Sequence, residues 1–83
     1  MRKKRMVEVE WVDSTTWGGW KRENEYLKDA GPGRCSSVGY LLKSDKQAVT
    51  LVQNLDVSNG NVSDAVSIPR SVVRKITTLE HKT

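Results

Sequence analysis

The chain has 83 residues, of which 36% are hydrophobic and 29% are charged. A chain this short has room for one domain with one thin core, and its composition is typical of a folded domain rather than of a disordered segment. No apolar run reaches the roughly 18 residues of a membrane-spanning helix, and the basic start is not followed by the apolar stretch of a signal peptide. We therefore expect a single cytoplasmic domain over residues 6–80 that gains burial as a homo-oligomer.

The positive charge is concentrated in a short N-terminal arm, residues 1–5. Arg2, Lys3, Lys4 and Arg5 together account for the formal net charge of +4, so the remainder of the chain is formally neutral. Such an arm can bind phosphate or RNA without sequence preference. A short terminal run of charge is more often a solvated tail, so the arm is weak support for a nucleic-acid partner.

The residue types disfavour catalysis and metal binding. One cysteine, Cys35, and one histidine, His81, cannot supply an internal disulfide, a zinc site, or a nucleophile with its base and orienting partner. Glu8 and Glu10 can mimic a carboxylate pair, but the solvated face of an amphipathic strand has the same spacing. We expect a non-enzymatic protein that needs neither a metal nor a cofactor.

Hydrophobic periodicity predicts five strands. In the first, Val7, Val9 and Trp11 alternate with glutamates, and Trp11 is expected to lie in the core. In the second, Val38, Tyr40 and Leu42 share one face. The predicted strands cover residues 7–11, 35–42, 48–55, 62–68 and 76–79.

The connections between these strands have distinct signatures. Residues 13–20 have the composition of a loop, and residues 21–30 predict a short helical turn or an irregular excursion. Gly39, inside a strand, predicts a bend or a close backbone approach. The segment 58–61, Ser-Asn-Gly-Asn, predicts a tight primed turn. Pro69 must end its strand, and the residues after it suit one helical turn.

These elements together predict an all-β fold. Five short strands, a long first connection and a one-turn helix before the last strand are typical of a small, highly bent barrel of the SH3-like or Sm-like kind. An OB-type barrel is the alternative, but it normally has a longer helix between the third and fourth strands.

The candidate site residues are aromatic and basic. Trp17 and Trp20 lie in a loop, where an indole can stack on a base, contact a protein, or cap the thin core. Gly18 and Gly19, between them, lack the accompanying residues of a phosphate-binding loop. Arginine can hold a phosphate with two hydrogen bonds, although solvation alone also explains surface cations. The predicted ligand-binding set is Trp17, Trp20, Lys21, Arg34, Arg70 and Arg74.

Several segments carry a resemblance to a known group of proteins. The segments 9–14, 19–20, 37–41 and 68–72, closing on Ile76 and Leu79, resemble short bacteriophage proteins with a small SH3-like or Sm-like barrel. The resemblance implies a phage accessory protein acting in the bacterial cytosol by stoichiometric binding. It also implies assembly into rings through strand addition at exposed edges.

Three functions remain open on these grounds. The first is sequestration of an anionic nucleotide-type immune signal of the host, favoured by loop aromatics near cations in a body of zero net charge. The second is a barrel that binds single-stranded RNA or DNA, with the basic arm contributing. The third is a protein that blocks a host enzyme, with Trp17 or Trp20 as the hot spot.

Overall fold

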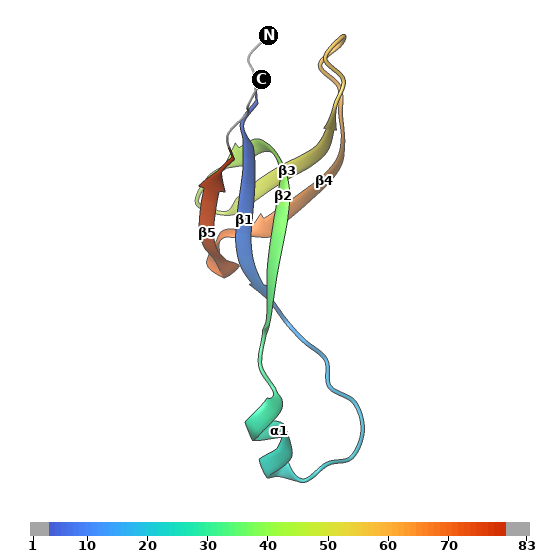
Figure 1. Cartoon of the computed structure of the whole chain (residues 1–83), viewed down its shortest axis with the longest axis vertical. Helices are drawn as coiled ribbons and strands as arrows, with labels where there is room; N and C mark the ends of the chain where they lie inside the picture. The colour runs from blue at the N-terminus through green and yellow to red at the C-terminus, as the bar shows by residue number, and fades with distance from the viewer. Residues whose placement is uncertain (1–3, 80–83) are drawn as a thin grey trace.

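The computed structural model describes residues 4–79, which form one antiparallel sheet, one short helix and one 3-10 turn (Figure 1). Most of the basic arm, residues 1–3, and His81 lie outside the described residues. The elements in chain order are β1 (Met6–Asp13), α1 (Glu23–Asp29), β2 (Gly33–Ser44), β3 (Ala48–Leu55), β4 (Val62–Pro69), η1 (Arg70–Val72) and β5 (Val73–Thr78). The mostly β fold, the short helix and the one-turn helix before the last strand are confirmed.

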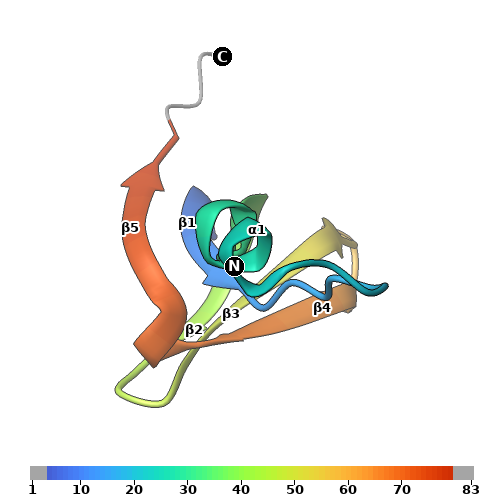
Figure 2. The same ribbon diagram turned by 90° about the horizontal axis from the view of Figure 1, so that it is seen from below.

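The sheet has the strand order β4-β3-β2-β1-β5, with antiparallel pairing throughout. β1 to β4 follow one another, and the chain then returns through η1 so that β5 pairs with the free edge of β1. Closure into a barrel, which the sequence predicts, is not observed in residues 4–79, because no ladder joins β4 to β5. Figure 2 shows these two edge strands diverging from the η1 corner.

The core lies on the concave side of the bent sheet. Alternation along β1 turns Val7 and Val9 inward, and the same period applies in β3 and β4. Trp11 is confirmed as a core residue: its ring packs against this cluster while its Nε1 donates a hydrogen bond to Ser37 Oγ at 3.0 Å. The buried cluster consists of Val7, Val9, Val49, Leu51 and Ile68.

The bend of β2 depends on Gly39. A Cβ on this residue would lie 2.9 Å from the backbone oxygen of Val52 and 3.2 Å from the side chain of Leu51, so the predicted close approach is confirmed. Gln53 Nε2 donates to Val38 O at 2.8 Å on the same bend. The register of β2 and β3 then shifts between Leu41 and Lys43, which adds local twist.

Val38 and Leu42 lie on one face of β2, as the alternation predicts. That face is largely exposed, since Val38 pairs with the outward-pointing Glu8, and Leu41 on the opposite face packs against the core. One detail of the sequence interpretation is wrong. The β3–β4 connection is a hairpin, but not a tight primed turn. Its loop closes through Asp56 N to Asn61 O at 2.8 Å, and only Gly60 in it has a positive φ, of 78°.

The connection between β1 and β2, residues 14–32, is named the excursion here because it extends well beyond the sheet (Figure 1). It contains α1, none of whose residues is buried. The radius of gyration of the chain is 17.1 Å, whereas a compact chain of this length has about 12 Å. The excursion therefore does not contribute to the core.

Replacing Gly39 with alanine is expected to destabilise the sheet by about 1–3 kcal/mol, because the new methyl group meets the backbone of Val52, which cannot move aside without distorting β3. Urea unfolding measures the change. Gly31→Ala is the matched control, since open space surrounds that position. Equal stabilities of the two variants would contradict the role given to the close approach.

Candidate functional site

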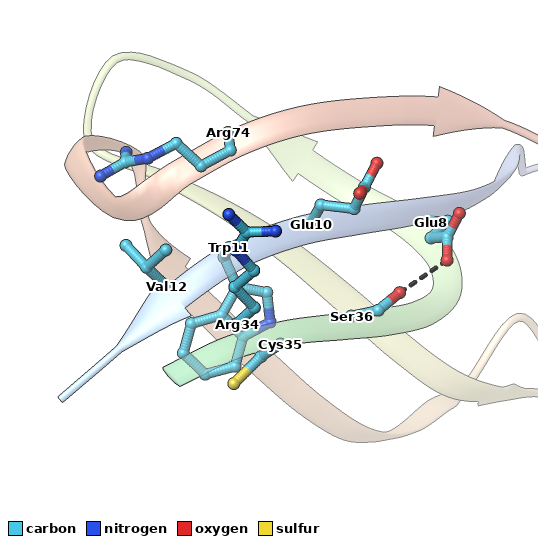
Figure 3. Close-up of a pocket in the computed structure, with 8 residues that line it drawn as sticks. All are labelled: Glu8, Glu10, Trp11, Val12, Arg34, Cys35, Ser36 and Arg74. Carbon is cyan, nitrogen blue, oxygen red and sulfur yellow. Dashed lines mark hydrogen bonds between the residues drawn. The ribbon is translucent and has the colours of Figure 1, made fainter. Parts of the chain in front are cut away.

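The candidate site is a groove of about 450 Å³ on the outer side of β1, β2 and the start of β5 (Figure 3). It is named the β1–β5 groove. Its lining includes two carboxylates and two guanidinium groups, together with uncharged polar and apolar side chains. The lining residues are Glu8, Glu10, Trp11, Val12, Arg34, Cys35, Ser36 and Arg74.

The alternation of side chains along β1 and β2 places several lining residues of the groove on the outer face of the sheet. Because Val7 and Val9 point into the core, Glu8 and Glu10 point to the opposite face. The β1–β2 register sets Glu10 beside Ser36 and Val12 beside Arg34, so two neighbouring strands present their side chains on the same surface. The carboxylates predicted on the solvated face of the first strand thus become lining residues of a groove.

A bulge supplies the second guanidinium group. The β1–β5 register passes from Glu10 opposite Lys75 to Trp11 opposite Val73, which leaves Arg74 as an extra residue of β5. Arg74 Nη1 donates to Ser71 O at 3.1 Å, so this side chain is held toward η1. The bulge is what brings a cation from the edge strand to the end of the groove.

The charges of the groove are arranged along its length. Figure 3 shows Glu8 with Ser36 at one end, Arg74 at the other, and Glu10 and Arg34 between them. Ser36 Oγ donates to Glu8 Oε2 at 2.6 Å, which orients that carboxylate. Within residues 4–79 neither arginine forms an ion pair with either glutamate. Both guanidinium groups therefore keep free donors for a ligand.

The charged side chains of the groove can bind complementary groups of a ligand. Guanidinium groups bind phosphate or carboxylate through paired N–H donors, and carboxylates accept hydrogen bonds from hydroxyl or amino groups. In the part of the chain that the structure describes, no group of three metal-binding side chains comes together. The groove can thus hold a small molecule that has an anionic end and an end rich in hydroxyl groups.

The structure separates the residues that the sequence groups into one site. Arg34 and Arg74 share the β1–β5 groove. Arg70 lies in a second hollow, beside Asp45 and Lys46, where its Nη1 donates to Ser44 Oγ at 3.0 Å. The basic, aromatic-rimmed pocket expected from all of them is not formed within one copy of residues 4–79.

Trp17, Trp20 and Lys21 lie in the excursion, away from the groove (Figure 1). Trp17 is 47% exposed and its Nε1 donates to Thr15 Oγ1 at 2.9 Å, while Trp20 is fully exposed. The Lys21 ammonium lies 5.6 Å from the centre of the Tyr26 ring. Neither indole caps the sheet core, so the two rings remain available for contacts outside their own chain.

Sequence reasoning missed Val12 and Ser36 as lining residues and interpreted Glu8 and Glu10 only as a solvated pair or a carboxylate dyad. The alternating pattern does place these side chains on an outward face. The pairing of β1 with both β2 and β5, which turns that face into a groove, requires the register and the bulge at Arg74, and neither has a local sequence signal.

Comparison with protein-family models, with curated proteins and with solved structures found no match for this chain. Among the described residues no helix is long and apolar enough to span a membrane.

The second hollow contains the carboxylate with the largest change of pKa. Backbone N–H groups of Ala48 and Gln47 donate to Asp45 Oδ1 at 2.9 and 2.8 Å, and the Lys43 ammonium lies 3.1 Å from its other oxygen. These contacts lower the pKa of Asp45 from 3.8 to about 2. The charged form of this side chain closes the turn between β2 and β3.

Because the pKa of Asp45 is lower in the folded state than in the unfolded state, its contribution to stability is full above pH 3.8 and is lost as the pH falls through about 2. The variant Asp45→Asn keeps an acceptor oxygen but loses the charge. We expect it to melt below the parent protein near neutral pH, with the two melting temperatures converging toward pH ~2. A difference in melting temperature that stays constant with pH would refute this account.

Proposed function

We propose that this protein is a non-enzymatic binding protein whose β1–β5 groove holds an anionic nucleotide-type ligand. The observation that carries the proposal is that Arg34 and Arg74, from two different strands, line one groove together with the carboxylates of Glu8 and Glu10. Neither guanidinium group is paired with a carboxylate in residues 4–79.

A phosphate group fits the basic end of this groove. Arginine presents planar, paired donors that match phosphate oxygens, and such charge-assisted hydrogen bonds are stronger than those between neutral groups. Arg34, at the start of β2, and Arg74, at the bulge in β5, both line this groove. A phosphate bound in it gives a guanidinium group the anionic partner that it lacks.

A ribose fits the acidic end. Glu8 and Glu10 have carboxylate oxygens that can accept hydrogen bonds from sugar hydroxyl groups, as acidic residues do in dinucleotide-binding sites. Ser36 already orients Glu8 through a 2.6 Å hydrogen bond. The same carboxylates repel a continuous chain of phosphates, which favours a compact nucleotide over the RNA or DNA strand of the alternative interpretation.

The architecture supports a small SH3-like or Sm-like barrel as the finer description of the fold. Four consecutive antiparallel strands, a fifth strand that returns to pair with the first, and a 3-10 turn before it are the elements expected for that group. With the resemblance to short bacteriophage proteins, this favours a homo-oligomeric phage accessory protein in the host cytosol. Its role there is to sequester a nucleotide immune signal and so to counter host defence.

A second candidate function has its own supporting observation. Trp20 is fully exposed and Leu27 is 76% exposed on an excursion that does not pack against the sheet. Exposed aromatic side chains of this kind are typical hot spots of protein interfaces. An inhibitor of a host enzyme that docks through residues 14–32 is therefore the alternative, and recovery of no host protein in a pull-down with the full chain would count against it.

Removing either arginine of the groove is expected to weaken binding of a nucleotide by about 10-fold or more, because each provides charge-assisted hydrogen bonds. Calorimetric titration of the parent protein, Arg34→Ala and Arg74→Ala with ADP, cyclic AMP and a diadenosine dinucleotide measures the effect. Lys46→Ala, an exposed cation outside the groove, is the matched control and is expected to bind like the parent.

The absence of binding heat for all three nucleotides would refute the proposal. Binding of a single-stranded oligonucleotide that weakens steeply with salt, and that is lost on deletion of residues 1–5, would instead support the nucleic-acid interpretation.

A further inference from the structure

We propose that the ligand site is shared between two copies of the chain, with Trp20 of one copy lying over the β1–β5 groove of the other. This inference rests on the proposed function, which it completes. Arg34 and Arg74 supply the contacts to phosphate, and the second copy supplies the aromatic face that a nucleobase requires.

The groove lacks an exposed aromatic face of its own. Trp11 lines it, but its ring packs against the core cluster and its Nε1 is bonded to Ser37. The outward side chains near the basic end are Val12, Arg34 and Arg74. An indole from outside fits there, because guanidinium groups stack on aromatic rings while their edges still donate hydrogen bonds.

The excursion carries such an indole, that of Trp20, which does not contact the groove of its own chain. It leaves the sheet at the end of β1 and extends away from it, so that α1 lies at the far end of the molecule (Figure 1). Trp20 is fully exposed there, and α1 buries none of its residues. A seven-residue helix is marginal by itself, and α1 gains no burial from its own chain, so its exposed side chains are free to contact a partner.

Internal hydrogen bonds hold the excursion in one shape. The Thr15 hydroxyl donates to Gly31 O and accepts from Trp17 Nε1, which ties the outgoing chain to the returning chain. Tyr26 Oη donates to Gly19 O at 2.6 Å and lies 3.2 Å from Gly18 O. A loop that is already ordered loses less entropy on docking, so Trp20 is presented in a form ready to bind.

Charge complementarity favours a second copy as the partner. The excursion has two cations, Lys21 and Arg22, followed by two carboxylates, Glu23 and Glu25. The groove has the same sequence of charges along its length, a basic end and an acidic end. With Lys21 and Arg22 laid against Glu8 and Glu10, opposite charges meet at the acidic end of the groove, and Arg34 and Arg74 stay open to the phosphate of the ligand.

Disulfide trapping between single-cysteine variants tests the docking without any ligand. One preparation has Lys21→Cys, beside Trp20, and the other has Ser36→Cys, in the groove; both have Cys35→Ser. Mixed at micromolar concentration with oxidised glutathione as the oxidant, they are expected to form the mixed K21C–S36C disulfide, identified by intact mass. The control is Asn59→Cys, at the tip of the β3–β4 hairpin, in place of Lys21→Cys.

We expect at least about tenfold more mixed disulfide from K21C than from N59C, because docking raises the effective concentration of the two thiols. Adding Trp20→Ala to the K21C chain is expected to remove this excess. Equal yields from K21C and N59C, or an excess that persists in the Trp20→Ala background, would overturn the proposal.

Fluorescence titration with an N-methylanthraniloyl derivative of ADP separates this inference from the proposed function. Both Trp20→Ala and the double variant Arg34→Ala/Arg74→Ala are expected to lose binding, and a mixture of the two is expected to regain about a quarter of the sites, since half of the dimers are mixed and each has one intact site. Loss in the arginine variant alone would overturn the shared site and leave the groove as the binding site. Unchanged binding in the arginine variant would overturn the proposed function itself.

Discussion

The structure depends on the two-sided character of β1. This strand is hydrogen-bonded to β2 on one edge and to β5 on the other, and it separates the hydrophobic core from the candidate site. Val7 and Val9 are completely buried on one face, while Glu8 and Glu10, the residues between and after them, line the groove on the other. The same alternation therefore stabilises the sheet and exposes its charges.

A thin core limits what such a sheet can do alone. Six hydrophobic side chains are buried in the described part of the chain, and domains of this size bury a modest share of their surface. The bends at Gly39 and at the β2–β3 register shift wrap the sheet around those few side chains. The curved sheet encloses these side chains without a second layer of helices or strands, and its convex face stays exposed.

Local sequence signals were sufficient where the chemistry is local. Pro69 cannot donate to a ladder, so β4 ends at that residue and η1 follows, as predicted. Gly39 was identified from its lack of a side chain within a strand, and the structure gives the reason in the backbone of Val52. Residues 21–30 carry helix formers, and of the two alternatives left open there, a short helical turn or an irregular excursion, the structure has the helix α1.

Features that depend on register were not predictable from a single sequence. The exposure of Val38 follows from its pairing with the outward-pointing Glu8, and the position of Arg74 follows from a bulge opposite β1. Neither feature has a signal in the local sequence, because both depend on how two strands distant in sequence align. Of the candidate residues, Arg34 and Arg74 line one groove, whereas Arg70 lies in a second hollow.

The excursion has a further consequence for how this chain can change over evolution. Its hydrogen bonds are internal to residues 15–31, and α1 buries nothing against the sheet. Substitutions at its exposed positions therefore leave the cooperative unfolding of the sheet largely unaffected, since local stability is set by local packing. The sequence of residues 14–32 can therefore diverge with little effect on folding, whereas the strands that line the groove tolerate far fewer replacements.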